Sequence, residues 1–330
     1  MNIKILSRSE VQKAVTMPQA IDVVRQAFIS FAQKKAILPL RTQVPVEKHA
    51  GITLFMPAYL PDIESLGAKI VSVFPQNVRK NKPTIHAAMI ICDAHTGQPS
   101  AMMDGSYLTA LRTGAVSGVA TDLLARQDAK TAAIFGAGIQ GRTQLEAICC
   151  VRDIQKVLVY DKNLQAARTY IEEMQHRSKP IPKNIVSVVS PEDALAEADV
   201  ICVATTSSTP VFEDLHLKTG VHINGVGSYT PEMQEIPEET IVRAKVTVDS
   251  VTACLEEAGD LIIPLQKGKI DESHIQAELG QVASGLVSVR ESEADITFFK
   301  SVGLAIQDVA VAQSALQKAT ELGLGMDIEI

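Results

Sequence analysis

One stretch of the chain, residues 132–141 (AAIFGAGIQG), constrains the fold more than any other. It begins as a short apolar run, which predicts a buried strand, and then breaks into Gly-x-Gly-x-x-Gly ahead of residues that can form a helix. A second apolar run, 157–160, is followed by Asp161, about 20 residues after Gly141. This layout is typical of a βαβ unit that binds a dinucleotide, although the glycines alone would also suit a βα turn without a ligand.

Each glycine of this motif has an expected role. Gly136 allows a tight turn, Gly138 lets the backbone approach a pyrophosphate, and Gly141 lets helix and strand pack closely. The phosphates would bind the free N–H groups at the helix N-terminus. Asp161 would accept hydrogen bonds from the adenosine ribose and repel a 2′-phosphate, which favours NAD(H). The adjacent Lys162 could neutralise that phosphate, which keeps NADP(H) as the alternative cofactor.

Strand-like and helix-like segments alternate from residue 131 onward. This alternation predicts an α/β Rossmann domain with a doubly wound parallel sheet. The expected helices include 165–175 and 191–197, and the expected strands are 132–135, 157–160, 185–189, 200–204, 222–225 and 245–248.

The first 105 residues predict a different, α+β module. An amphipathic helix over 17–32 is followed by strand-like runs, mostly antiparallel, at 42–46, 53–55, 68–73, 87–92 and 99–103. A last helix, 304–322, is apolar on more than one face and is therefore expected to be buried against this module. We expect a discontinuous domain, 1–115 with 305–330, and a Rossmann domain over 116–304.

Composition excludes several functional classes. The net charge of −7 and the absence of a long basic run argue against a nucleic-acid partner. No apolar run reaches the roughly 18 residues of a membrane span, and the N-terminal residues lack the apolar segment of a signal peptide, so a cytoplasmic protein is expected. Five cysteines and seven histidines show neither Cys-x-x-Cys nor His-x-x-x-His spacing, which predicts no metal site.

Three cations lie in mainly apolar segments: Arg41, Lys69 and Arg112. A charge in such a setting is costly without a partner. For the arginines the functional partner would be a substrate carboxylate bound bidentately, whereas desolvation would lower the pKa of Lys69 and let it act as a proton donor. The alternative is that each cation pairs with a nearby acid, such as Asp104, or extends to the surface.

At these residues the chain resembles the ornithine cyclodeaminase/mu-crystallin family. Nine motifs in the family's order carry the resemblance over nearly the whole chain: LPLRT (38–42), FMPAY (55–59), GAKIV (67–71), AMMDG (101–105), LRTGA (111–115), GAGIQ (136–140), HINGVGS (222–228), AELG (277–280) and SVGLAIQD (301–308).

The resemblance implies an N-terminal substrate and dimerisation domain joined to a Rossmann domain, in a homodimer. It also implies that Arg41, Lys69 and Arg112 line the substrate site, with Arg112 near both substrate and cofactor. The positions at which the family contacts the dinucleotide correspond here to Thr84, Ile139, Gln140, Asp161, Thr205, Val226 and Ser301. The family's chemistries share hydride transfer between a nicotinamide and a carbon that bears nitrogen.

Two departures from the family pattern narrow the activity. Leu54 and Tyr229 stand where the cyclodeaminases carry acids, and a diamine substrate needs an anionic partner and a base for its distal nitrogen. Tyrosine is a poor base at neutral pH because its reference pKa is about 10. Glu232 and Glu235 follow Tyr229, but we expect them to be exposed loop acids.

The sequence therefore predicts an NAD(P)H-dependent oxidoreductase of amino-acid metabolism. Its substrates would be small cyclic imino acids, Δ1-pyrroline-2-carboxylate or Δ1-piperideine-2-carboxylate, reduced to L-proline or L-pipecolate. Arg41 and Arg112 would hold the substrate carboxylate, and Lys69 would supply the proton. The alternatives are an ornithine cyclodeaminase, an alanine-type dehydrogenase and a non-catalytic binding protein of the mu-crystallin kind.

Overall fold

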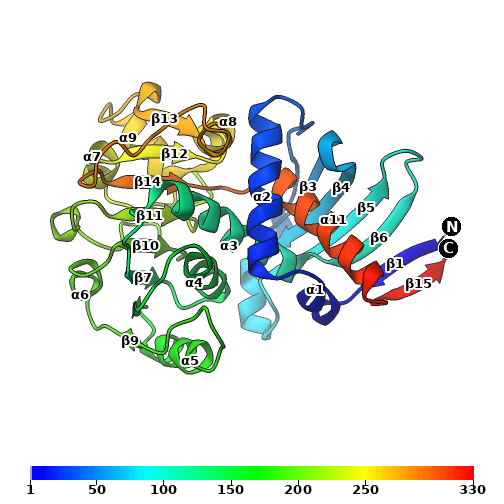
Figure 1. Ribbon diagram of the computed structural model, residues 1–330, viewed down its shortest axis with the longest axis horizontal. Coiled ribbons are helices and arrows are strands. Elements are labelled where there is room, and N and C mark those ends of the chain that lie inside the picture. Colours follow the sequence, from blue (N-terminus) through cyan, green and yellow to red (C-terminus); the bar gives the residue numbers. More distant parts are fainter. Residues whose placement is uncertain (1) are drawn as a thin grey trace. The chain divides into compact units, whose positions relative to one another are not determined.

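The computed structural model describes residues 2–330, and the contacts within it divide the chain into two units (Figure 1). Unit 1 comprises Met1–Arg112 and Leu304–Ile330, and unit 2 comprises Thr113–Gly303. The first division falls inside one helix, α3 (Gly105–Leu124). No helix within residues 2–330 has the length and apolar character needed to cross a bilayer.

Unit 1 contains a seven-stranded sheet in the order β15-β1-β6-β5-β4-β3-β2. All neighbouring pairs are antiparallel except β1 with β6. The expected strands are present and mostly longer than expected, whereas β1 and β15 were not expected. The bounds are β1 Asn2–Leu6, β2 Thr42–Val46, β3 Gly51–Leu60, β4 Ser65–Val73, β5 Ile85–Asp93, β6 Pro99–Asp104 and β15 Met326–Glu329.

One face of this sheet is covered by a helix that comes from the end of the chain. Helix α11 (Ala305–Glu321) contacts β3, β4 and β5, and helices α1 (Arg8–Ala14) and α2 (Met17–Ala32) pack against α11 (Figure 1). Helix α2 begins at the residue expected from the sequence, where Thr16 and Gln19 form a capping box. The sheet alternates accordingly, because Met56, Lys69 and Met89 are paired in register and buried on this face.

Unit 2 is a doubly wound α/β domain, which confirms the predicted fold class. Its parallel sheet has the order β13-β12-β14-β11-β10-β7-β8-β9. The strands are β7 Thr131–Phe135, β8 Lys156–Tyr160, β9 Ile185–Ser187, β10 Val200–Val203, β11 His222–Gly225, β12 Lys245–Val248, β13 Ile275–Glu278 and β14 Thr297–Lys300. The helices are α4 Ile139–Val151, α5 Leu164–Gln175, α6 Pro191–Leu195, α7 Glu238–Arg243, α8 Val251–Glu257, α9 Gly259–Gln266 and α10 Leu279–Ala283.

The strand order places a topological switch point between β7 and β10. From β7 the chain winds outward through β8 and β9 and then returns to β10 on the other side. In sheets of this kind, ligands bind outside the carboxyl ends of the strands at such a point. The glycine-rich turn directly follows β7, so the sequence motif lies at the switch point.

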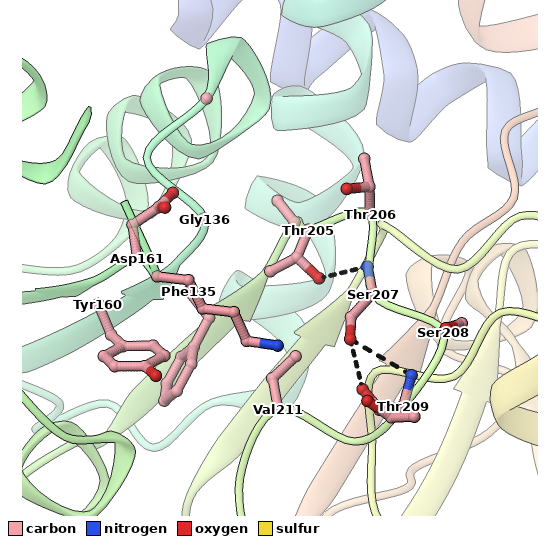
Figure 2. A pocket seen from close by; sticks show the side chains of 13 residues that line it. Phe135, Gly136, Tyr160, Asp161, Thr205, Thr206, Ser207, Ser208, Thr209 and Val211 are labelled. Atoms are coloured by element: carbon pink, nitrogen blue, oxygen red, sulfur yellow. Dashed lines mark hydrogen bonds between the residues drawn. The ribbon is translucent and has the colours of Figure 1, made fainter. Parts of the chain in front are cut away.

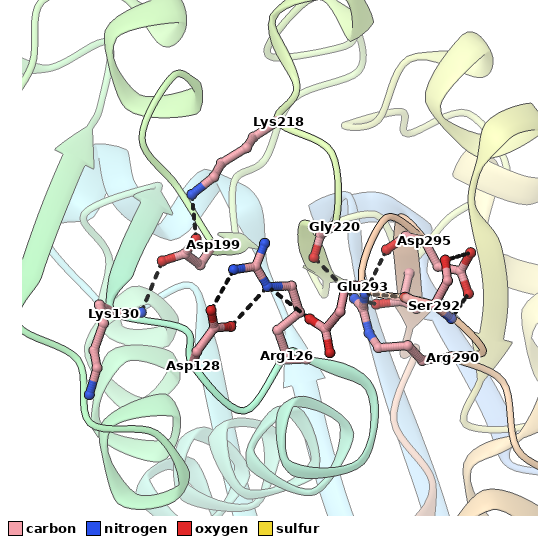
Figure 3. Close-up of polar contacts among 12 residues, drawn as sticks. Arg126, Asp128, Lys130, Asp199, Lys218, Gly220, Arg290, Ser292, Glu293 and Asp295 are labelled. Atoms are coloured by element: carbon pink, nitrogen blue, oxygen red, sulfur yellow. Dashed lines mark hydrogen bonds and ion pairs between the residues drawn. The ribbon is translucent and has the colours of Figure 1, made fainter.

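The opposite, amino-terminal edge of this sheet is closed by a network of charged groups (Figure 3). Asp199 precedes β10, accepts hydrogen bonds from the Lys130 and Thr131 amides at 2.9 and 3.0 Å, and pairs with Lys218. The Arg290 guanidinium donates to the Leu124, Gly220 and Asp295 carbonyls. These bonds satisfy backbone groups at strand starts and loops, so we assign this network a structural role.

Candidate functional site

The turn between β7 and α4 has the geometry that the three glycines predict. Gly136 has φ 100°, and a Cβ there would lie 2.5 Å from the Ala204 carbonyl oxygen. A Cβ on Gly141 would lie 2.2 Å from the Gly136 oxygen, so helix and turn meet at a contact only glycine allows. A Cβ on Gly138 would meet nothing within 4 Å, so the backbone at the N-terminus of α4 is open to a ligand.

A cavity of about 530 Å³ lies beside this turn, at the carboxyl ends of β7, β8 and β10 (Figure 2). Five of the predicted cofactor residues line it: Gly136, Gly138, Asp161, Lys162 and Thr205. The lining also includes residues that were not predicted: Phe135, Tyr160, Ala204, Thr206, Ser207, Ser208, Thr209 and Val211. The serines and threonines follow β10 in one polar run, and this run, directly after a buried strand, was the sequence signal from which they could have been predicted.

Asp161 is held in place at the end of β8. One carboxylate oxygen accepts a hydrogen bond from the Ala137 amide at 2.8 Å, and the other accepts one from the Asn163 amide at 2.8 Å. The carboxylate is therefore tied to the glycine-rich turn and remains part of the cavity wall. A 2′-phosphate placed there would meet this negative charge, with the exposed Lys162 beside it.

The other predicted cofactor residues do not line this cavity. Ile139 and Gln140 form the first turn of α4, and Val226 and Ser301 follow β11 and β14. All four belong to the same carboxyl edge of the parallel sheet as the cavity, because β14, β11, β10 and β7 are successive neighbours. Thr84 belongs to unit 1, where its carbonyl accepts a hydrogen bond from the Phe74 amide.

Two of the three predicted cations of unit 1, Lys69 and Arg112, meet at one buried carboxylate, Asp308 of α11. The Lys69 ammonium on β4 lies 2.7 Å from Asp308 Oδ2, and Arg112 Nε on α3 donates to Asp308 Oδ1 at 2.9 Å. Arg112 Nη1 also donates to Gln307 Oε1 at 2.6 Å. The suggested partner Asp104 was wrong, because it accepts a hydrogen bond from the Tyr107 amide at the start of α3 instead.

Burial and neighbouring charges tune Lys69. Desolvation by burial, together with the positive charges of Arg112 and Arg41, lowers the pKa of Lys69 to about 8, although the charge of Asp308 opposes this shift. A lysine with this pKa still holds its proton at neutral pH but releases it far more readily than an exposed lysine. The effect of Arg41 on Lys69 places the three predicted cations in one electrostatic cluster.

Glu235 was expected to be an exposed loop acid, and this expectation was wrong. Its side chain is fully buried, and its carboxylate accepts hydrogen bonds from the Thr205, Gly227 and Ser228 amides. The chain turns inward after the exposed Glu232 because the main chain at Glu235 and Ile236 binds the buried Asp260.

The two departures from the family pattern lie in different units. Leu54 is on β3, two residues from Met56, which pairs with Lys69, so Leu54 is on the same face of the sheet as Lys69. Tyr229 is 45% exposed in the loop after β11. Neither position carries a negative charge, and the Glu235 carboxylate is occupied by three backbone amides and the Thr205 hydroxyl.

Comparison with known proteins gives full-length matches. A model of the ornithine cyclodeaminase/mu-crystallin family matches residues 1–322. A Delta(1)-pyrroline-2-carboxylate reductase of Bacillus cereus is 43% identical, covering 98% of this chain and 99% of that protein. The structure of the Thermococcus litoralis Delta(1)-pyrroline-2-carboxylate reductase, in complex with NADH and L-proline, matches with a TM-score of 0.95 at 45% identity, covering 99% and 100% of the two chains. An archaeal alanine dehydrogenase dimer with bound NAD matches with a TM-score of 0.93 at 35% identity, covering 100% of both chains.

Proposed function

This chain belongs to the ornithine cyclodeaminase/mu-crystallin family, and we propose that it is an NADH-dependent reductase that converts Δ1-pyrroline-2-carboxylate to L-proline. The observation that carries the proposal is the buried cluster in which Lys69 and Arg112 share Asp308. The same chain has an open glycine-rich turn and a cavity suited to a dinucleotide. The similar T. litoralis reductase was solved with NADH and L-proline.

The reaction adds a hydride to the imine carbon and a proton to the imine nitrogen. When bound, NADH supplies the hydride. Lys69 supplies the proton from Nζ, and its lowered pKa makes this release possible near neutral pH. Arg41 and Arg112 bind the substrate carboxylate, and the bonds from Arg112 to Asp308 and Gln307 hold its guanidinium in a fixed plane.

The cofactor is assigned to the carboxyl edge of the unit 2 sheet. Gly136, Gly138 and Gly141 give the phosphates access to the N-terminus of α4, and Asp161 favours NADH over NADPH. The exposed Lys162 leaves weaker binding of NADPH open. The further residues that we assign to the dinucleotide are Thr84, Arg112, Ile139, Gln140, Thr205, Val226 and Ser301.

We further propose that the protein is a homodimer formed through unit 1. The face of the sheet opposite α11 carries an apolar patch that extends across β2 to β6. On it Val44 and Met102 are each 45% exposed and Phe55 is 41% exposed, with Ala68 and Ile90 between them in register. A contiguous apolar face of this kind is typical of a subunit interface. The similar archaeal alanine dehydrogenase was solved as a dimer.

Ornithine cyclodeamination is the main alternative, and the position of the acids disfavours it. A diamine substrate would need an anion near its distal nitrogen. Leu54 is on the Lys69 face of the sheet, where a cyclodeaminase carries an acid, and it has no charge. Glu235 cannot substitute for it, because its carboxylate is buried beneath the loops of unit 2 and satisfied by their donors.

The proposal is tested by following NADH and NADPH oxidation by the purified protein. The panel is Δ1-pyrroline-2-carboxylate, Δ1-piperideine-2-carboxylate, and pyruvate with and without ammonium, while ornithine with NAD is assayed for ammonia release. Turnover of the five-membered imine without ammonium, faster with NADH, is the expected result. A requirement for ammonium would establish the alanine-type dehydrogenase instead, and ammonia from ornithine would establish the cyclodeaminase. Cofactor binding with no turnover of any substrate would favour a binding protein.

A further inference from the structure

Glu235 is a buried carboxylate that accepts four hydrogen bonds from the loops beside the cofactor cavity. Its Oε1 accepts hydrogen bonds from the Thr205 amide at 2.6 Å and the Thr205 hydroxyl at 2.7 Å. Its Oε2 accepts hydrogen bonds from the Gly227 amide at 2.7 Å and the Ser228 amide at 2.9 Å. One side chain therefore joins the loop after β10 to the loop after β11.

The fit between these two loops leaves no spare room. A Cβ on Gly227 would lie 2.3 Å from Glu235 Oε1 and 2.3 Å from the Thr205 carbonyl oxygen. The Thr205 hydroxyl also accepts a hydrogen bond from the Ser207 amide at 3.1 Å, which extends the connection into the polar wall of the cavity (Figure 2). Glu235 is not itself among the residues that line the cavity, so it reaches a ligand there only through the loops it binds.

Two further buried charged side chains, Asp260 and Lys300, fix the main chain at Glu235. Asp260 Oδ1 accepts hydrogen bonds from the Glu235 and Ile236 amides at 2.7 and 3.0 Å, and Asp260 Oδ2 lies 2.8 Å from Lys300 Nζ. All three charged side chains are fully buried. Lys300 ends β14 and directly precedes Ser301, so the cluster connects the carboxyl ends of β10, β11 and β14, which are neighbours in the sheet.

Burying two carboxylates with one ammonium is unfavourable unless the excess charge is compensated. Burial and the nearby Asp260 raise the pKa of Glu235, while Lys300 and the Thr205 donors oppose them. A carboxylate is retained there because only an ionised group offers acceptors to all four donors at once. A glutamine has a single oxygen and would turn N–H groups toward the donors of one loop.

We propose that Glu235 is a positioning residue for the dinucleotide, which it serves by fixing the loops that carry Thr205 and Val226. The proposal rests on the cofactor assignment made above. When the carboxylate is replaced, the two loops lose their common acceptor and the cofactor must order them on binding. The consequence is weaker binding of NADH, with little change in the chemistry once NADH is bound.

The test compares Glu235→Gln with Glu232→Gln, which makes the same charge change three residues away at an exposed position. The dissociation constant for NADH is measured by titrating NADH fluorescence, and kcat is measured at saturating NADH. We expect Glu235→Gln to weaken NADH binding about tenfold or more, the equivalent of one lost charge-assisted hydrogen bond, and to change kcat less than about threefold. Glu232→Gln should match the wild type.

Thr205→Val provides a variant that keeps the carboxylate and removes one donor. Because Glu235 acts through Thr205, the double variant should lose less affinity than the sum of the two single losses, a coupling that general destabilisation would not produce. If Glu235→Gln does not fold, Glu235→Asp takes its place, because it keeps the charge and shortens the reach of the carboxylate toward the two loops: a several-fold loss of NADH affinity supports the proposal, and unchanged affinity overturns it. Equal losses in Glu235→Gln and Glu232→Gln also overturn it. A wild-type protein that binds neither NADH nor NADPH would instead overturn the proposed function.

Discussion

Replacing Asp308 with asparagine removes the charge shared by Lys69 and Arg112 and keeps the shape of the side chain. The carboxylate lies 2.7 Å from the Lys69 ammonium and 2.9 Å from Arg112 Nε, and all three side chains are buried. Removing one partner of a buried ion pair leaves uncompensated charge and typically reduces the free energy of unfolding by about 3–5 kcal/mol. We expect a loss of this size for Asp308→Asn, measured by urea unfolding.

The same change should move the pH dependence of the reaction. Lys69 must carry its proton to donate it, so wild-type kcat/KM should fall as pH rises through about 8. Asp308 is the main group that opposes the effect of burial on Lys69, so the pKa of Lys69 falls when its charge is removed. Loss of an opposite charge at this range typically shifts a pKa by about 1–3 units, and each unit corresponds to about 1.4 kcal/mol. The alkaline limb of the pH profile of kcat/KM should therefore shift to lower pH by at least about one unit.

The assay is the initial rate of NADH oxidation with Δ1-pyrroline-2-carboxylate, at saturating NADH, across the neutral and alkaline range. Asp104→Asn is the matched control, because Asp104 binds the Tyr107 amide and should leave the alkaline limb where it is in the wild type. A folded Asp308→Asn protein whose alkaline limb coincides with that of the wild type would refute the assignment of Lys69 as the proton donor tuned by Asp308.

Four further outcomes are expected. Lys69→Ala should lower kcat by about 10²–10⁴-fold and leave the NADH dissociation constant unchanged in a fluorescence titration. Arg112→Ala should lower kcat/KM for the imine by about 10-fold to 150-fold, the value of a charge-assisted hydrogen bond to the substrate carboxylate. Gly138→Ala should keep the wild-type melting temperature, because its Cβ meets no protein atom, but it should lose NADH affinity, because that space is the one assigned to the cofactor. Gly141→Ala should lose NADH affinity and also destabilise the fold by about 1–3 kcal/mol, because its Cβ would lie 2.2 Å from the Gly136 oxygen. The pKa of Lys69 in the folded protein, about 8, lies below its ordinary value of 10.5, so the unfolded chain binds more protons between these two pH values. The free energy of unfolding of the wild type should therefore rise with pH in this window. Parallel urea titrations should show a smaller rise for Lys69→Met.

The parts of the fold that could be predicted from sequence are those with a local signal. The glycine motif and the apolar runs around it predicted the β7–α4–β8 unit and most of the parallel sheet. Strands β13 and β14 were missed because charged residues break their apolar pattern: β13 ends in Glu278, and β14 ends in a buried lysine, Lys300. Their place in the sheet depends on pairing with β12 and β11, and this pairing has no signature in their own residues.

The residues of the candidate site likewise divide into those that have a local sequence signal and those that do not. Lys69 and Arg112 were predicted because a charge in an apolar segment needs a partner. The partner was not predicted, although Asp308 carries the same signal, a carboxylate inside the apolar helix α11. Glu235 was misjudged because acids in loops are usually solvated, and its burial follows from contacts with residues up to 30 positions away in the chain.

The order of the chain has a consequence for how the protein is made. Arg112 and its partner Asp308 are 196 residues apart, and all of unit 2 is synthesised between them. At about 5–20 residues per second, the ribosome needs roughly 10–40 s to cover that distance, which is long compared with the folding of most domains. Unit 2 can therefore fold while unit 1 still lacks α11, the helix that covers its sheet. Until that helix emerges, Lys69 on the uncovered sheet and Arg112 on α3 lack their common counter-ion, and this nascent species is the one that we expect to need protection from aggregation.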